Sequence, residues 1–340
     1  MKKISIRKIV SVLISAAVVM GMTACGSSDK NSETSTGAVT EASVTISEEP
    51  NTDTTEPVSL PKYEKEYSEI ENVTAVSENK FSCTYEGVSH EFIFYRPDTD
   101  YCCPLVLMLH GYGESAEKFR DTSHFEEDAL QEDYAVCYVT GAPNPYDATS
   151  SNGWNSGIAA DGNDDVGFLM ALTDYLRMEY NLHEEKLYAV GFSNGAFMIH
   201  RLAVEAGYMF TGLVSVAGKM PESIWKERDL QHAVQYTSFF QVTGSKDDVV
   251  PLKSSGTDKY AKDPAMEDVI DYMVEKTGLD KDNPDESYYN TTSVLTKYNK
   301  GGNNRIWNLL IDGGRHSWPD EQIIKININK LILEFFKDIK

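Results

Sequence analysis

The fold of this 340-residue chain can be predicted starting from the pentapeptide Gly191-Phe192-Ser193-Asn194-Gly195. An apolar run over 186–190 comes directly before it, and a helical period over 195–205 begins at its end. At such a sharp turn from strand to helix, a serine is held above the sheet in a strained conformation. The strand and helix also pass so closely that both flanking positions need glycine. The pattern therefore predicts a nucleophilic Ser193 at the end of a buried strand.

Further apolar runs of strand length lie on both sides of this turn, at 104–109, 134–139, 211–216, 237–242 and 305–311. Because they lack polar alternation, we expect strands that are buried on both faces. Helical periods alternate with them at 164–180, 266–276 and 321–337, and a hairpin over 80–85 and 90–96 precedes them all. The alternation predicts one α/β domain over 66–340, with a mostly parallel central sheet flanked by helices.

A serine hydroxyl is a weak nucleophile until a base removes its proton, so a histidine is expected. Resemblance of the turn to that of α/β-hydrolases implies that this histidine follows Ser193 and an acid in the chain. Three histidines follow Ser193. His200 lies on the helix that leaves the turn, and His232 lies in a polar stretch with no strand leading into it. His316 follows the apolar run 305–311 in a glycine-rich loop that can reach over the sheet edge. We expect His316 to be the base.

The acid that orients this base should leave another strand end. Asp247 and Asp248 both follow the apolar run 237–242, and position alone leaves either of them possible. A carboxylate there would accept a hydrogen bond from the imidazole and fix its tautomer.

Two backbone N–H groups are expected to hold the oxyanion. The first belongs to Asn194, the residue after the nucleophile, and the second to Tyr112 in the segment His110-Gly111-Tyr112-Gly113. The segment follows the apolar run 104–109, and its two glycines allow a tight backbone. We expect His110 to brace this loop.

Six motifs stand in one order over most of the predicted domain. They are Leu109-His110-Gly111-Tyr112, Gly153-Trp154-Asn155, Asp164-Asp165-Val166-Gly167-Phe168, Gly191–Gly195, Asp247…Val250-Pro251 and Gly314-Arg315-His316-Ser317-Trp318-Pro319. This set resembles the secreted esterase group that contains feruloyl esterases, acetylxylan esterases and poly(3-hydroxybutyrate) depolymerase-like enzymes. The resemblance implies an α/β-hydrolase fold and no cofactor. It also implies that the triad acid comes from an Asp-x-x-Val-Pro segment, which favours Asp247.

Two tryptophans are candidates for binding the substrate. The indoles of Trp154 and Trp318 would suit a sugar or aromatic ring in the cleft, and core packing is the competing explanation for each. No metal site is expected, since the adjacent Cys102 and Cys103 have no further cysteine at close spacing. Exported chains permit disulfides, but the sequence leaves the pairing of these two, Cys83 and Cys137 open.

The first 24 residues have the pattern of a signal peptide, with a basic start and an apolar stretch over 9–22. The segment Met22-Thr23-Ala24-Cys25 resembles a bacterial lipobox, which implies lipidation of Cys25 and attachment to the extracellular face of a bacterial membrane. Ordinary cleavage and an uncleaved anchor are the alternatives. Residues 25–65 are rich in Ser, Thr, Glu and Asp, and we expect a disordered acidic tether there.

The composition excludes several other classes of protein. With 53 acidic against 31 basic residues and a net charge of −22, the chain is not expected to bind nucleic acid. No second long apolar run follows the leader, which argues against a polytopic membrane protein.

The sequence thus predicts a surface-tethered serine carboxylic-ester hydrolase that removes feruloyl or acetyl esters from plant polysaccharide. Its partners would be a polymeric carbohydrate ester and, through Cys25, the membrane. A polyester depolymerase, a serine peptidase of the same fold and a non-catalytic surface binding protein are the alternatives, in that order. The segment 251–290, between the acid and the histidine, is expected to shape substrate preference, and the oligomeric state stays open.

Overall fold

The structure is a computed structural model that describes residues 66–143, 150–157, 162–231, 233–253, 256–289 and 292–339. The predicted signal peptide over 1–24, the lipidation site Cys25 and the whole tether over 25–65 therefore lie outside the described residues, as does His232. No helix in the described part of the chain combines the length and apolar character needed to cross a bilayer.

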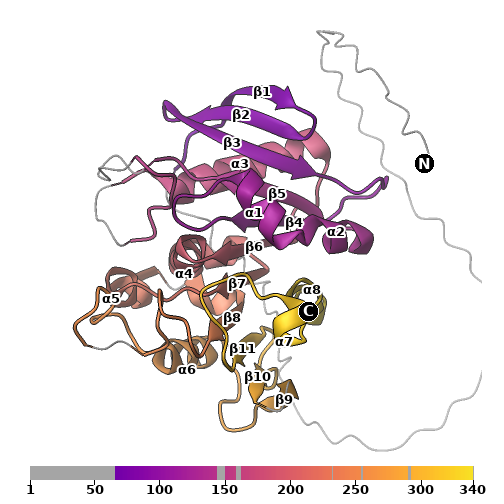
Figure 1. The fold of residues 1–340 in the computed structure, drawn as a ribbon. Helices are drawn as coiled ribbons and strands as arrows, with labels where there is room; N and C mark the ends of the chain where they lie inside the picture. Colours follow the sequence, from indigo (N-terminus) through magenta and orange to yellow (C-terminus); the bar gives the residue numbers. More distant parts are fainter. Residues whose placement is uncertain are drawn as a thin grey trace, which may run out of the picture. The chain divides into compact units, whose positions relative to one another are not determined.

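One sheet of eleven strands organises the described domain. Its spatial order is β1-β2-β3-β5-β4-β6-β7-β8-β11-β10-β9, so β1 and β9 form the two edges (Figure 1). The strands are β1 (Glu71–Ser77), β2 (Lys80–Tyr85), β3 (Val88–Tyr95), β4 (Leu105–Leu109), β5 (Ala135–Thr140), β6 (Leu187–Phe192), β7 (Gly212–Val216), β8 (Ser238–Gly244), β9 (Asp285–Tyr289), β10 (Ser293–Tyr298) and β11 (Ile306–Ile311).

The middle of the sheet is parallel and its two ends are antiparallel. Strands β5, β4, β6, β7, β8 and β11 pair in parallel, whereas β1, β2 and β3 at one end and β9 and β10 at the other pair antiparallel. Parallel strands end at the same edge of a sheet, so the loops after β4, β6, β8 and β11 can meet there. The predicted α/β fold with a mostly parallel centre is confirmed.

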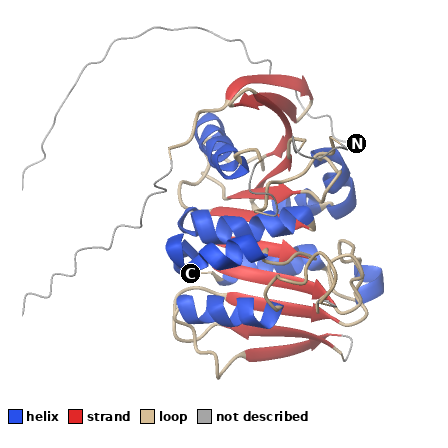
Figure 2. Ribbon diagram, turned by 90° about the vertical axis from the view of Figure 1, so that its left-hand side faces the viewer, coloured by secondary structure: helices blue, strands red, loops and turns tan. Residues whose placement is uncertain are grey.

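Helices lie on both faces of this sheet (Figure 2). They are α1 (Ala116–Ser123), α2 (Phe125–Ala129), α3 (Asp165–Tyr180), α4 (Asn194–Ala206), α5 (Glu222–Gln231), α6 (Met266–Lys276), α7 (Glu321–Ile324) and α8 (Ile328–Asp338), with short 3-10 turns at Leu130–Glu132, Gly207–Met209 and Ala233–Tyr236.

The alternation of side chains along β4 shows how the two layers form. Leu105, Leu107 and Leu109 are buried in one hydrophobic cluster with residues of α3, α4 and α6. Val106 and Met108 are buried in a second cluster with residues of α1, α2 and α8. Both faces of the strand are therefore covered, which is why its sequence is apolar without interruption.

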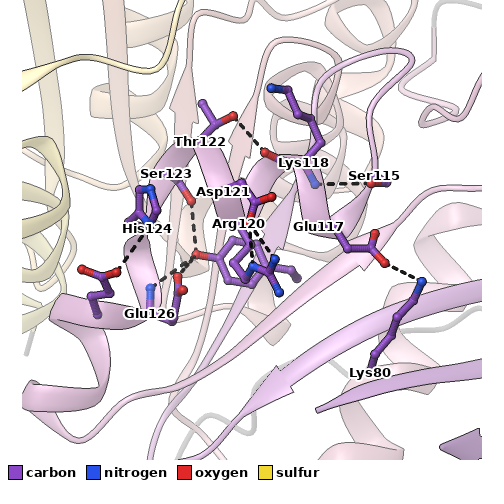
Figure 3. A network of polar contacts seen from close by, with 12 residues as sticks. Lys80, Ser115, Glu117, Lys118, Arg120, Asp121, Thr122, Ser123, His124 and Glu126 are labelled. Carbon is purple, nitrogen blue, oxygen red and sulfur yellow. Dashed lines mark hydrogen bonds and ion pairs between the residues drawn. The ribbon is translucent and has the colours of Figure 1, made fainter. Parts of the chain in front are cut away.

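A buried hydroxyl joins α1 and α2 to the sheet (Figure 3). The Tyr138 hydroxyl on β5 donates to Glu126 Oε2 at 2.7 Å and accepts from the Phe125 N–H at 3.0 Å, and it lies 3.1 Å from Ser123 Oγ. His124, between the two helices, has a φ of 48°, which ends α1. The sequence did not predict these two helices, which are short.

Other differences from the prediction have local causes. The expected helix over 321–337 is two helices, because Lys325 has a φ of 60° and the side chain of Asn327 caps the start of α8 through the Lys330 N–H. The edge strands β1 and β9 were not predicted, since their side chains are mostly exposed and no apolar run marks them.

The four cysteines of the domain are free thiols. Cys83, Cys103 and Cys137 are buried, and Cys102 is exposed. The structure thus places three of these side chains in the core as small apolar groups.

Candidate active site

Ser193 stands at the turn between β6 and α4, where the sequence predicted it. Its φ of 51° and ψ of −115° are strained for a residue with a side chain, and its N–H donates to the Val216 carbonyl at 3.0 Å. A Cβ on Gly191 would lie 2.2 Å from the Gly195 oxygen, and a Cβ on Gly195 would lie 2.1 Å from the Leu109 oxygen. Only glycine fits at either position, because backbone occupies the space.

His316 lies between Ser193 and Asp247. The Ser193 hydroxyl donates to His316 Nε2 across 2.9 Å, and His316 Nδ1–H donates to Asp247 Oδ2 across 2.8 Å. This is the arrangement in which an imidazole accepts a proton from a nucleophile while a carboxylate fixes its tautomer. The three side chains come from loops 123 and 69 residues apart in sequence, and the fold brings them together.

The structure separates the two candidate acids. The Asp247 side chain is fully buried, and its Oδ1 accepts from the N–H groups of Val249 at 3.0 Å and Val250 at 2.7 Å. One oxygen is thus held by the backbone while the other faces the imidazole. Asp248 is exposed. Of the two carboxylates left open by sequence position, Asp247 is the one that contacts His316.

Backbone contacts join the acid loop to the histidine loop. The Lys246 N–H donates to the Gly314 carbonyl at 2.8 Å, and the Ser245 N–H donates to the Ile311 carbonyl at 2.9 Å. A Cβ on Gly244 would lie 2.4 Å from the Gly314 oxygen, so the two loops are in direct backbone contact. This contact fixes the position of the imidazole relative to the carboxylate.

On the other side of Ser193, His110 braces the loop that carries Tyr112. The buried ring lies with Nδ1 2.6 Å from the Gly111 carbonyl and with Nε2 accepting from the Gly141 N–H at 2.9 Å. Burial lowers the pKa of His110 to about 4, so the ring is neutral near pH 7 and can accept this bond. The bracing role expected for His110 agrees with this geometry.

The loop around Tyr112 is also tied at both ends. Gly111 N–H donates to Glu114 Oε2 at 3.1 Å, and Gly113 N–H donates to the Asn152 carbonyl at 2.8 Å. Asn194, the other expected oxyanion donor, is the first residue of α4, where backbone N–H groups have no partner within the helix. The positions of Tyr112 and Asn194 follow neighbouring strands β4 and β6.

The side chain of Asn194 has a function that the sequence did not predict. Its Oδ1 accepts from the Trp154 N–H at 2.7 Å, and its Nδ2 donates to the Trp154 carbonyl at 3.2 Å. This reciprocal pair ties the segment 150–157 to the first residue of α4. The sequence signal for this contact was the motif Gly153-Trp154-Asn155, because it belongs to the same set of family-like motifs as Gly191–Gly195.

The next residue of that segment is held by two ionisable side chains. Asp165, at the start of α3, accepts from the Asn155 N–H at 2.6 Å, and Arg201 of α4 donates to the Asn155 carbonyl. Burial raises the pKa of Asp165 to about 7, against the opposing effects of the Asn155 N–H and the nearby Arg201. A buried carboxyl therefore supports the loop next to the nucleophile.

Neither tryptophan lines a cleft. The Trp154 indole is buried, and its Nε1–H donates to the His110 carbonyl at 2.9 Å. Trp318 is buried against the ring of Phe119, and its Nε1–H donates to Asn329 Oδ1 at 3.3 Å. Core packing, the competing explanation, accounts for both side chains.

His200 belongs to a polar network beneath the nucleophile. Its ring is fully buried on α4, with Nε2 3.2 Å from Gln241 Oε1 and 3.3 Å from Ser215 Oγ. Gln241 Nε2 in turn donates to the Gly218 carbonyl at 3.1 Å and to Thr243 Oγ1 at 3.0 Å. The network links α4 to β7 and β8. The His200 side chain therefore points into the core, where it cannot serve as the base for Ser193.

Within the described ranges, the one His and carboxylate group compact enough to hold a metal ion is His124, Glu126 and Glu127. It lies at the junction of α1 and α2, and Glu126 already accepts from the Tyr138 hydroxyl.

The chain is similar in sequence to one protein family and to two known proteins. Residues 102–263 match the family described as Serine hydrolase (FSH1). A protein from Nocardia uniformis subsp. tsuyamanensis that is named as an esterase, NocK, is 27% identical, over 64% of this chain and 65% of its own. The bifunctional acetylxylan esterase/xylanase XynS20E of Neocallimastix patriciarum is 24% identical, over 43% of this chain and 20% of its own. The chain thus spans less than two thirds of the length of either relative.

A solved structure shows the same fold. The acetyl xylan esterase from Aspergillus awamori superposes with a TM-score of 0.54 and 14% identity, over 80% of this chain and 100% of that one. The α/β-hydrolase fold expected from the sequence is therefore confirmed. Over residues 102–263, within this fold, the chain is similar to the family described as Serine hydrolase (FSH1).

Proposed function

We propose that the protein is a serine carboxylic-ester hydrolase that acts on feruloyl or acetyl esters of plant polysaccharide. The observation that carries the proposal is the chain of short contacts from Ser193 through His316 to Asp247. The similarity to two proteins named as esterases supports the bond type, and the similarity to an acetylxylan esterase supports the substrate class.

The reaction begins with attack of Ser193 Oγ on the ester carbonyl. His316 Nε2 takes the hydroxyl proton as the new C–O bond forms, and Asp247 stabilises the imidazolium through Nδ1–H. Collapse of the tetrahedral intermediate transfers that proton to the leaving alcohol and leaves an acyl group on Ser193. Water, activated by the same imidazole, then releases the acid and restores the serine.

The oxyanion is held by the N–H groups of Tyr112 and Asn194. Fixed donors aimed at the developing charge contribute most when they need no reorganisation. The bonds from Gly113 to Asn152 and from Trp154 to Asn194 supply this rigidity, because they fix the backbone on both sides of the expected oxyanion position. No cofactor has a role in these steps.

The proposal includes attachment to the outer face of a bacterial membrane. Its basis is the sequence of the first 25 residues, in which Cys25 follows an apolar stretch of signal-peptide length. A lipid on Cys25 would hold the enzyme beside an insoluble polymer, and the acidic segment 25–65 would give it reach. Incorporation of an alkyne-tagged fatty acid into the expressed protein, lost in Cys25→Ser, tests this part.

Hydrolysis of p-nitrophenyl acetate and methyl ferulate by the parent protein and by Ser193→Ala tests the central proposal. Turnover of both esters that disappears in the variant is expected. Turnover of the acetate alone would contradict the feruloyl assignment and leave acetylated xylan and polyesters to be tried. Absence of Ser193-dependent turnover of either would reject ester hydrolysis and favour the peptidase or binding-protein alternatives.

A further inference from the structure

Two exposed apolar side chains flank the nucleophile. Six large hydrophobic residues are exposed in the part of the chain that the structure describes. Val76, Tyr101, Met178 and Tyr288 lie away from the loops of the triad, on or beside β1, β4, α3 and β9. The other two are Tyr112, which is 54% exposed in the oxyanion loop, and Val249, which is 49% exposed in the acid loop.

The sheet order sets the distance between these two residues. Tyr112 follows β4, Ser193 follows β6, and Val249 follows β8, with β7 between the last two. Adjacent strands are about 4.8 Å apart, so three steps place the two loops roughly 14 Å apart with the nucleophile between them. The loops that carry Tyr112 and Val249 therefore leave the sheet on opposite sides of β6, the strand that leads to Ser193.

The ring of Tyr112 rests on a glycine beside the expected oxyanion donors. A Cβ on Gly153 would lie 3.4 Å from Tyr112 Cδ2 and 3.2 Å from Asn194 Oδ1. The tyrosine ring and the Asn194 side chain thus meet over the same small residue. Hydrogen bonds from Gly111 to Glu114 and from Gly113 to Asn152 fix the backbone on either side of Tyr112. The ring is therefore held in place on a rigid loop although half of its surface is exposed.

We propose that the Tyr112 side chain stacks on the ring of an aromatic acyl group and thereby selects aromatic esters over short alkyl esters. The inference rests on the proposed function, and it assigns to Tyr112 the contact that the buried Trp154 and Trp318 do not make. An exposed aromatic ring gains contact with a second ring in an offset or edge-on geometry, whereas an acetyl group leaves it uncovered. Val249 covers the opposite side of the bound ester.

The test compares methyl ferulate, whose acyl group carries an aromatic ring, with ethyl acetate, whose acyl group is a short alkyl group. Values of kcat/KM are measured with the full protein for the parent, Tyr112→Ala, Tyr112→Phe and Tyr101→Ala. Tyr101 is a matched control, because it is 53% exposed and precedes β4, whereas Tyr112 follows the same strand. The quantity compared is the selectivity ratio, ferulate over acetate.

Tyr112→Ala is expected to lower this ratio about 2- to 10-fold, mainly by raising KM for methyl ferulate, which corresponds to the loss of one aromatic pair. Tyr112→Phe and Tyr101→Ala are expected to keep the parent ratio. Ferulic acid, tested as a competitive inhibitor of ethyl acetate hydrolysis, should bind Tyr112→Ala more weakly by a similar factor.

An unchanged selectivity ratio in Tyr112→Ala, or an equal fall in kcat/KM for both esters, would overturn the assignment. Either result would show that the Tyr112 side chain makes no contact that depends on the ring of the acyl group. A parent that hydrolyses ethyl acetate but not methyl ferulate would also overturn it while leaving the esterase proposal intact. Absence of Ser193-dependent turnover of both esters would instead reject the proposed function, and the stacking role with it.

Discussion

The two sides of Ser193 are built in different ways. On one side, the loops after β8 and β11 bring Asp247 and His316 together through contacts of main chain with main chain, as between Gly244 and Gly314. On the other side, buried polar side chains hold the loops, including His110 beneath the oxyanion loop and Asp165 beneath Asn155. The proton relay needs two side chains at fixed distance, and the oxyanion site needs a rigid backbone. Each side is held by the kind of contact that suits its task.

The largest expected effect breaks the side-chain relay. Replacement Asp247→Asn leaves the shape nearly unchanged but removes the negative charge and disturbs the imidazole tautomer, so kcat should fall by about 10⁴-fold. Asp248→Asn is the matched control one residue away, because Asp248 is exposed. Ester turnover measured under saturating substrate checks both. Equal effects of the two substitutions would show that Asp247 is not the acid.

A second change affects the backbone at the nucleophile. In Gly195→Ala the new Cβ would lie 2.1 Å from the Leu109 oxygen, so either β4 or α4 must move. Overpacking of this kind costs about 1–3 kcal/mol, and the shift would also misplace Ser193. Urea unfolding measures the first effect and ester turnover the second. Gly256→Ala separates the clash from backbone strain, since the φ of +82° at Gly256 is unfavourable for alanine while nothing lies within 4 Å of a Cβ there. It should lower stability without changing the rate of ester turnover.

The two hydrogen bonds between the Asn194 side chain and the Trp154 backbone form a clamp on the oxyanion side, which should contribute a comparable amount to stability. Asn194→Ala removes both hydrogen bonds to the Trp154 backbone, each with a net contribution of about 1 kcal/mol, so the free energy of unfolding should fall by about 2 kcal/mol. The rate should fall as well, because the segment 150–157 loses its attachment to α4. Asn303→Ala, in an exposed loop, is the control for stability, because the contact of Asn303 with Arg305 uses the backbone carbonyl and is kept in alanine. A variant with parent stability and parent kcat would show that the clamp has no role.

The last expected effect is a change in how the free energy of unfolding depends on pH. Folding raises the pKa of Asp165 from about 4 to about 7, so the folded state favours the neutral carboxyl and loses stability as pH rises through this window. Arg201 opposes the shift and Asp164 adds to it. Asp165→Asn removes this titration and can still accept from the Asn155 N–H.

The stability of Asp165→Asn relative to the parent should therefore increase between pH 4 and pH 7 and stay constant above that. Urea unfolding of both proteins at several pH values measures the difference. Burial lowers the pKa of His90 and His110 to about 4, but both histidines are present in the two proteins, so their effects cancel. A difference that does not change with pH would contradict the buried, neutral carboxyl.

The contrast between the two sides also explains what the sequence could predict. Ser193, His316 and the strands that lead to them follow from short patterns, because glycines and unbroken apolar runs are local requirements of a sharp turn and a buried strand. The choice of Asp247 over Asp248 needed the family resemblance at the sequence level, and the structure separates the two by burial. The parallel centre of the sheet was predicted for the same local reasons.

The clamps on the oxyanion side could not be predicted in this way. Asn194 and Trp154 are 40 residues apart, and Asp165 and Arg201 meet the same Asn155 from two different helices. Nothing in the local sequence distinguishes a carboxylate that supports a loop from one that is solvated. The two tryptophans were predicted to bind substrate but are buried, because an indole in a motif does not reveal whether its ring is exposed.

Covalent labelling with a fluorophosphonate tests most directly whether Ser193 is activated by His316. Intact-mass measurement and peptide mapping are made on the parent, Ser193→Ala and His316→Ala. The account predicts a single adduct on the peptide that contains Ser193 in the parent, no adduct in Ser193→Ala, and labelling slowed by orders of magnitude in His316→Ala. An adduct that persists in Ser193→Ala, or a parent that is not labelled, would contradict it.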